Sequence, residues 1–486
     1  MMRSENKKEK QEGSAFGGFL RYLYGNIIVL LLGFVSIPLI TRVMSNEQYG
    51  RTGMFTSAVT VIYIFAILGM DQAYIRYYYT KGIDRRELLA RCLFPALGIV
   101  ILLCVIYCAF SVPANDFLFG EQGRDLTGLV IAYTIISVFE RFLFLDIRMS
   151  QNGRLYSNLN ITSKVIYIIL IVLFAKMMGD DFRVVLWAMT LSLGVVTLGI
   201  GIRYLVLNIG RTEKMAPENT LSQKELTAYG IPFILVLLTE WVLASCDKWS
   251  LRIWSDYGEL GIYNSAMNIM SILLTFKATF VAFWSPVAME KYENRDKEEC
   301  IGFFKSAFKI TRCLCILAAI GLILFRGVIV YILGPKYREA SGIIPFLTLM
   351  PIFSILFEIV CQGIKFTKKN RYLNYASFVA IVFNMGLNAV LVPIIGGKGA
   401  ALATAVTYLA YFAIGCIFSE KCYAVGYDNV KTAVYAMLLL AYAFETTFFG
   451  SFWRDILCGG VAVVLVILAD LGTIKTCLGY LFRRKT

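Results

Sequence analysis

The chain has 486 residues, of which 58% are hydrophobic and 16% charged, with a mean hydropathy of +0.67 and a net charge of +14. Soluble proteins are nearer half apolar and a quarter charged, and apolar runs of about 20 residues recur along this sequence, so a soluble protein is excluded. The chain has no histidine, which excludes imidazole metal sites and Ser-His or Cys-His nucleophile pairs. Its twelve cysteines are scattered and are interpreted as small apolar residues, so no metal and no cofactor is predicted.

Apolar segments long enough to cross a bilayer follow one another through the whole chain, which predicts an all-α polytopic membrane protein. In chain order, these segments lie at about 18–40, 53–70, 88–110, 126–147, 155–175, 184–207, 226–250, 259–287, 306–332, 340–364, 372–394, 398–418, 432–450 and 456–478. The sequence therefore predicts about fourteen transmembrane helices.

The distribution of basic residues fixes the predicted orientation. With the N-terminus in the cytoplasm, 28 of the 47 basic residues fall in cytoplasmic segments and 10 in outer segments. Cytoplasmic loops of membrane proteins carry such an excess of Lys and Arg, so both termini are predicted to be cytoplasmic. The basic residues form no compact module, and no nucleic-acid partner is predicted.

A ten-residue pattern occurs twice, 208 positions apart, at Tyr49–Ala58 and at Tyr257–Ala266. Both copies read Tyr-Gly-x-x-Gly-apolar-aromatic-polar-Ser-Ala and begin the second and the eighth predicted span. An even number of spans separates them, which predicts two six-helix lobes related by a pseudo-two-fold axis along the membrane normal. The expected divisions are an N-lobe (1–208), a cytoplasmic linker (209–225), a C-lobe (226–418) and two further helices with the C-terminus (419–486).

Charged residues inside the predicted spans are the candidate functional residues. A charge at the bilayer centre costs at least about 2.5–3.5 kcal/mol on insertion scales, so it normally faces protein or water. Basic residues from both lobes would form a hydrated cationic cavity suited to a phosphate-bearing substrate; scattered structural pairing is the alternative. The candidate cations on this ground are Arg21, Lys277, Arg141 and Lys164.

Four stretches of the sequence carry a resemblance to a known family. The first two are Ser45–Gly50 and Leu68–Tyr77. The third consists of Tyr229–Pro232, Asp247-Lys248 and Gly261–Tyr263. The fourth runs from Asn388 to Thr404 and includes Val392-Pro393 and Gly399–Ala403. Because the four stretches occur in this order, the chain resembles bacterial polysaccharide-biosynthesis flippases of the multidrug/oligosaccharidyl-lipid/polysaccharide exporter superfamily. Relatives often carry Asp-Arg where this chain has Asp247-Lys248, so the charge is kept while the bidentate phosphate geometry of arginine is lost.

The resemblance implies a two-lobe, non-enzymatic transporter that works by alternating access. It would move an undecaprenyl-pyrophosphate-linked oligosaccharide from the cytoplasmic to the outer leaflet of the bacterial inner membrane, for capsule, O-antigen or exopolysaccharide synthesis. Membrane lipids and a proton or sodium ion would be its other partners. The resemblance adds Arg76 and Lys248 to the substrate cations, although Arg76 can equally be a topology-fixing charge. It also implies the ion-coupling candidates Asp71, Glu140, Glu240 and Asp247.

Three other functions are compatible with a polytopic chain. A peptidoglycan-precursor flippase would carry the same lipid pyrophosphate. A multidrug antiporter usually has twelve spans, and a basic cavity would repel cationic drugs. A polytopic glycosyltransferase usually needs catalytic groups on long outer loops, and the longest predicted outer loop is only about 111–125.

Overall fold

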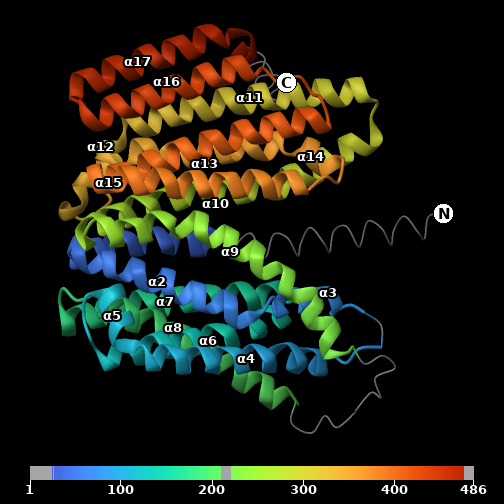
Figure 1. The fold of residues 1–486 in the computed structure, drawn as a ribbon, viewed down its shortest axis with the longest axis vertical. Coiled ribbons are helices and arrows are strands. Elements are labelled where there is room, and N and C mark those ends of the chain that lie inside the picture. Colours follow the sequence, from blue (N-terminus) through green and yellow to red (C-terminus); the bar gives the residue numbers. More distant parts are fainter. Residues whose placement is uncertain (1–24, 26, 81, 209–220, 476–486) are drawn as a thin grey trace. The chain divides into compact units, whose positions relative to one another are not determined.

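The computed structural model describes residues 25, 27–80, 82–208 and 221–475, and these residues form helices and connecting turns without any strand. The helices are α2 (Asn46–Ile67), α3 (Met70–Tyr77), α4 (Arg85–Ala109), α5 (Ser111–Phe119), α6 (Arg124–Met149), α7 (Gly153–Met178), α8 (Arg183–Asn208), α9 (Gln223–Trp254), α10 (Tyr257–Asn294), α11 (Lys297–Leu324), α12 (Arg326–Val330), the 3-10 helix η1 (Pro335–Gly342), α13 (Ile344–Val360), α14 (Gln362–Phe366), α15 (Arg371–Cys422), α16 (Asn429–Phe448) and α17 (Phe452–Ala469) (Figure 1). The predicted all-α membrane fold is confirmed.

Eleven helices of the described ranges are long and apolar enough to cross a membrane, and a shorter apolar helix lies at Ile27–Val43. Short polar side chains cap the N-termini of several of these helices. The Asp84, Asn152 and Asp256 side chains accept hydrogen bonds from backbone N–H groups of the first turns of α4, α7 and α10, which satisfies donors that the helix itself leaves unpaired. The count of fourteen spans stays a prediction.

Helix α15 contains a reversal of the chain. A straight helix of its 52 residues would be about 78 Å long, far more than the roughly 30 Å of a bilayer core. The backbone is non-helical at Ile395 and Gly396, and the Asn384 Nδ2 atom donates to Thr407 Oγ1 at 3.4 Å across 23 residues. The two predicted spans at 372–394 and 398–418 are therefore the two arms of a hairpin.

Glycines make this hairpin possible. Gly396 has a φ of +54°, in the left-handed region that glycine tolerates best. A Cβ atom on Gly399 would lie 2.4 Å from the Leu391 carbonyl oxygen, so only glycine allows the two arms to approach this closely.

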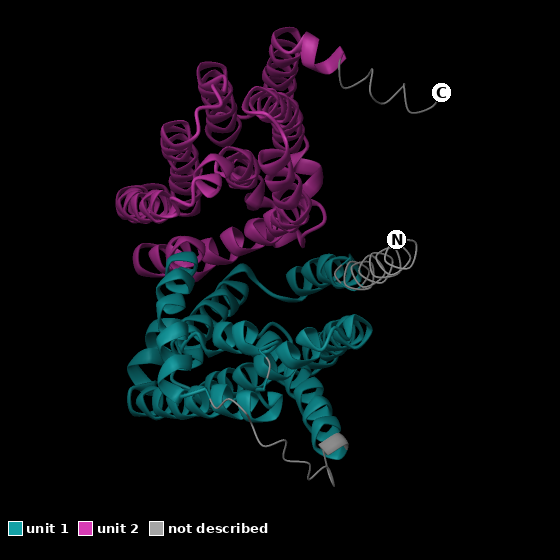
Figure 2. Ribbon diagram, turned by 90° about the vertical axis from the view of Figure 1, so that its right-hand side faces the viewer, with its two compact units in different colours: residues 1–241 teal, residues 242–486 magenta. Residues whose placement is uncertain are grey.

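The chain forms two compact units, unit 1 (Met1–Trp241) and unit 2 (Val242–Thr486) (Figure 2). The division falls within α9. The two copies of the sequence repeat begin α2 in unit 1 and α10 in unit 2, and most residues of each copy are buried. Superposition of the two lobes remains a prediction.

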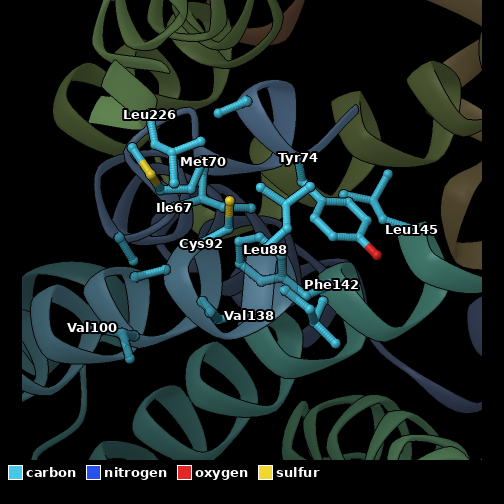
Figure 3. Close-up of a cluster of buried hydrophobic side chains, with 14 of the residues drawn as sticks. Ile67, Met70, Tyr74, Leu88, Cys92, Val100, Val138, Phe142, Leu145 and Leu226 are labelled. Atoms are coloured by element: carbon cyan, nitrogen blue, oxygen red, sulfur yellow. The ribbon is translucent and has the colours of Figure 1, made fainter. Parts of the chain in front are cut away.

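The core of unit 1 joins α3, α4 and α6 with the start of α9. Figure 3 shows side chains from these helices converging, with Met70 and Tyr74 of α3 against Leu88 and Cys92 of α4. Tyr74 is fully buried, and its hydroxyl donates to Asp146 Oδ1 of α6 at 2.7 Å. The polar end of this ring is thus satisfied while its apolar body fills the core.

Two glycines from different family-like stretches meet in unit 1. Gly69, with a φ of +66°, precedes α3, and Gly230 lies in α9. A Cβ atom on Gly69 would lie 2.1 Å from the Gly230 carbonyl oxygen. The close approach of the two backbones explains why both positions are glycine.

Helix α13 is the central helix of unit 2. It packs against α10, α11 and α15, and sixteen of its seventeen residues are buried, Glu358 being the exception. The last helices join this unit through a charged cluster in which fully buried Arg312 of α11 donates to Thr432 Oγ1 at 3.0 Å. Asp470, at the end of α17, accepts from Lys431 Nζ at 2.6 Å.

Candidate functional site

The strongest concentration of buried polar groups in unit 2 surrounds Asp247 of α9, whose exposed fraction is 4%. The Thr404 hydroxyl donates to Asp247 Oδ2 at 2.5 Å, and Asn388 Nδ2 donates to Oδ1 at 2.8 Å. The Tyr263 hydroxyl donates to Oδ2 as well. These partners come from both arms of the α15 hairpin and from the repeat copy in α10. Among the described residues, no cation forms an ion pair with this carboxylate.

This Asp247 cluster, which also includes Asn384, is rich in neutral oxygen atoms. The Asn388 Oδ1 atom is buried and has no hydrogen-bond partner among the described residues. Asn388 Nδ2 also donates to Asn384 Oδ1 at 3.1 Å. A carboxylate with amide and hydroxyl oxygens is the ligand chemistry of a small hard cation. The described residues contain no group of three or more His, Cys, Asp or Glu side chains placed to hold a metal ion.

A second buried carboxylate lies in unit 1. Asp71 of α3, 2% exposed, accepts from Arg141 of α6 through Nη2 at 2.6 Å and Nε at 3.2 Å. The side chain of Gln72 donates to the same oxygen, Oδ2, at 3.0 Å, and the Gln72 backbone N–H donates to Oδ1 at 2.9 Å. The structure therefore pairs one predicted ion-coupling acid with one predicted substrate cation, and Arg141 is neutralised by its partner. Glu140 adjoins this pair in sequence and is partly buried.

A third charged group lies in unit 2, where Lys277 of α10 faces Glu358 of α13. The Lys277 Nζ atom lies 3.3 Å from Glu358 Oε1, and the Lys365 Nζ atom of α14 lies 3.3 Å from Oε2. The three side chains are 28%, 16% and 32% exposed, in the order Lys277, Glu358, Lys365. This group is accessible and carries two cations on one anion.

The remaining candidates from the sequence lie apart from these groups. Lys164 of α7 and Lys248 of α9 are partly buried, and Arg76 is exposed; none of the three forms an ion pair with a described residue. Lys164 contacts the Tyr167 ring at 4.6 Å. Glu240 is exposed. Arg21 lies outside the described residues.

Several residues of these groups were not among the sequence candidates. Asn388, Thr404 and Tyr263 belonged to recognised stretches, and their polar side chains within apolar helices were the available signal. Glu358 is a charge within the predicted span at about 340–364, and Lys365 lies in the predicted cytoplasmic loop directly after it. The pairing of Lys277 with Glu358 depends on how α10 packs against α13, and no spacing in the sequence reports it. Glu358 and Lys365 lie seven residues apart, about two helical turns, which was the available signal for that pair.

The comparison with protein families decides the identity of the chain. Residues 17–292, more than half of the chain, match the family described as "Polysaccharide biosynthesis protein". The chain belongs to this family. It is a multi-pass membrane flippase of the polysaccharide type and not an enzyme.

Two curated relatives align with about four fifths of the chain. It is 20% identical over 393 residues to the "Probable low-salt glycan biosynthesis flippase Agl15" of Haloferax volcanii, covering 80% of each chain. It is 22% identical over 419 residues to the "Uncharacterized membrane protein MJ1068" of Methanocaldococcus jannaschii, covering 81% of this chain and 82% of the relative.

Solved structures share the fold of the flippase. "Lipid II flippase MurJ, inward closed conformation" has a TM-score of 0.66 at 16% identity, covering 93% of this chain and 99% of that one. An inward-facing multidrug resistance MATE family transporter of the MOP superfamily has a TM-score of 0.56 at 17% identity, covering 84% and 95%. These similarities establish a transporter fold.

Proposed function

We propose that the protein flips an undecaprenyl-pyrophosphate-linked oligosaccharide from the cytoplasmic to the outer leaflet of a bacterial inner membrane by alternating access. Membership of the polysaccharide biosynthesis family supports the substrate class. The observation that carries the proposal is the excess of cationic side chains within apolar helices. Lys164 and Lys248 have no ion-pair partner among the described residues, and Lys277 shares its carboxylate with a second lysine.

The cations would bind the diphosphate, the most strongly charged part of such a substrate. Placing a cation inside an apolar helix is costly unless water or an anion faces it, and ammonium groups bind phosphate oxygens through charge-assisted hydrogen bonds. Lys277, Lys164, Lys248, Arg76 and Arg21 are the proposed contributors. Arg141 contributes only when its pair with Asp71 opens. The lipid tail would stay in the bilayer throughout.

The Asp247 cluster would couple transport to an ion gradient. Its carboxylate has hydroxyl and amide neighbours, together with an unused amide oxygen on Asn388. A sodium ion would bind these oxygens directly, whereas a proton would bind the carboxylate. Either ion would alter the hydrogen bonds that join α9 to both arms of the α15 hairpin, and would thereby bias the conformation of unit 2. Among the four predicted acids, Asp247 is favoured because Asp71 already has an arginine partner.

A peptidoglycan precursor is the second candidate substrate, favoured by the fold similarity to a lipid II flippase. Both substrates carry a polyprenyl diphosphate, so the cations would serve either one. Parallel flipping assays with the two lipid-linked substrates distinguish them.

The cation proposal is tested with Lys277→Ala and Arg21→Ala in cells that depend on the protein for surface polysaccharide. Both variants should reach the membrane at normal levels and lose flipping, and Lys277→Arg and Arg21→Lys should restore part of it. Lys297→Ala is the matched control, because Lys297 is exposed at the start of α11. Normal surface polysaccharide in both alanine variants contradicts the proposal.

A further inference from the structure

Glu358 occupies an exceptional place in unit 2. Every other residue of α13 between Ile344 and Val360 is buried, so this helix is enclosed by its neighbours and reaches the surface only through the Glu358 side chain. At that point α10 supplies Lys277 and α14 supplies Lys365, each 3.3 Å from a different oxygen of the carboxylate. Two further titratable groups lie near the carboxylate, namely Cys361, with its Sγ atom 3.8 Å from Glu358 Oε2, and Tyr411 of α15.

The charge of this group is unbalanced. Two ammonium groups share one carboxylate, which leaves one positive charge in excess. The cluster around Arg312 differs, because Arg312 and Lys431 face both Asp428 and Asp470 and are therefore neutral together. The Arg326–Asp455 pair, at 2.7 Å, is also balanced. Each lysine of the Glu358 group uses one of three ammonium donors on the carboxylate, so donors remain for a second anion.

We propose that Lys277 and Lys365 form a phosphate-binding site and that Glu358 is its internal counter-ion, which a phosphate group of the substrate displaces. The identity of that substrate rests on the proposed function. Without substrate, the carboxylate holds both ammonium groups in place. A diphosphate has more charge and more acceptor oxygens than a carboxylate, so it takes over both lysines and Glu358 turns towards water. When the substrate leaves, Glu358 binds the lysines again and hinders recapture of the product.

Binding of inorganic pyrophosphate to the purified protein, measured by calorimetry in uncharged detergent, tests the site. Glu358→Gln removes the competing charge and keeps the shape of the side chain. We expect it to bind pyrophosphate about three- to tenfold more tightly, the range that two partly exposed ion pairs account for. Lys365→Ala should bind it more weakly than the wild type. Asp455→Asn, which breaks a balanced pair in the same unit, should leave the affinity unchanged.

A transport assay distinguishes a counter-ion role of Glu358 from a purely structural role. With lipid-linked oligosaccharide in proteoliposomes, Glu358→Gln should lower both the half-saturating substrate concentration and the maximal rate, because release becomes slow. Competition by polyprenyl diphosphate but not by phosphatidylglycerol shows that the substrate headgroup, and not a bulk lipid, occupies the site. The reverse preference would overturn the assignment of the site to substrate.

Equal or weaker pyrophosphate binding by folded Glu358→Gln overturns the proposal. If that variant does not fold, unchanged binding by Lys365→Ala overturns it. The proposed function can fail separately. If pyrophosphate binds with the expected pattern but the wild-type protein moves no lipid-linked oligosaccharide, the anion-binding site is supported and the proposed transport substrate is wrong.

Discussion

Replacement of Asp247 separates the structural and the ion-coupling roles of its cluster. Asp247→Ala leaves two donors without their acceptor, the hydroxyls of Tyr263 and Thr404, whereas the amide of Asn388 keeps its hydrogen bond to Asn384. A buried donor that loses its partner costs about 1–3 kcal/mol. The two hydroxyls can rotate, and the unused Asn388 Oδ1 atom offers one alternative acceptor. We therefore expect a net loss of about 2–4 kcal/mol in the free energy of unfolding.

Asp247→Asn removes the charge with little change of shape. The new amide oxygen still accepts from a hydroxyl, while its NH₂ group faces one donor of Asn388, so we expect a loss of only about 1–2 kcal/mol. This variant should fold, reach the membrane, and lose the acceleration of flipping by an imposed ion gradient.

Unfolding by denaturing detergent measures the stability of both variants, and flipping in proteoliposomes with imposed proton or sodium gradients measures coupling. Unfolding of Asp247→Ala at the wild-type detergent concentration would contradict the hydrogen-bond argument. Unchanged ion dependence in Asp247→Asn would refute Asp247 as the coupling site.

Two further predictions concern packing and topology. Gly230→Ala places a Cβ atom 2.8 Å from the carbonyl oxygens of Gly69 and Leu68, and it should destabilise unit 1 by about 1–3 kcal/mol. Gly199→Ala is the control, because its Cβ atom meets nothing within 4 Å. Equal stability of the two variants in denaturing detergent would contradict the close approach. Cysteines placed at Lys297 and at Lys368 in a cysteine-free background should react only with membrane-permeant thiol reagents in intact cells, and labelling of either from outside would reverse the predicted orientation.

The all-α membrane fold could be predicted from the sequence because long apolar runs reflect the bilayer directly. The turn at Ile395 and Gly396 was also predictable, since glycines clustered between two apolar segments mark a backbone that must reverse. The recognised stretches proved informative in pairs: Gly69 meets Gly230, and Asp247 meets Asn388 and Thr404.

The partners of the charged side chains were much less predictable. Arg141 was expected to serve the substrate and Asp71 the coupling ion, yet the structure joins them in one ion pair. Lys365 lies in a predicted cytoplasmic loop, where basic residues are expected for topology alone, although it shares Glu358 with Lys277. Helical periodicity gives the face of one helix, whereas such pairs depend on which neighbouring helix covers that face.

Flipping by the purified protein in liposomes tests the central claim most directly. A fluorescent oligosaccharide on undecaprenyl pyrophosphate is incorporated symmetrically, and a membrane-impermeant reagent destroys the fluorophores that it can reach. Without transport, about half of the signal should survive. The account predicts that the wild-type protein lets the reagent reach nearly all of it, and that Lys277→Ala, incorporated at the same density, keeps the protected half. Equal protection with wild-type protein and with empty liposomes, under every imposed ion gradient, would contradict the account.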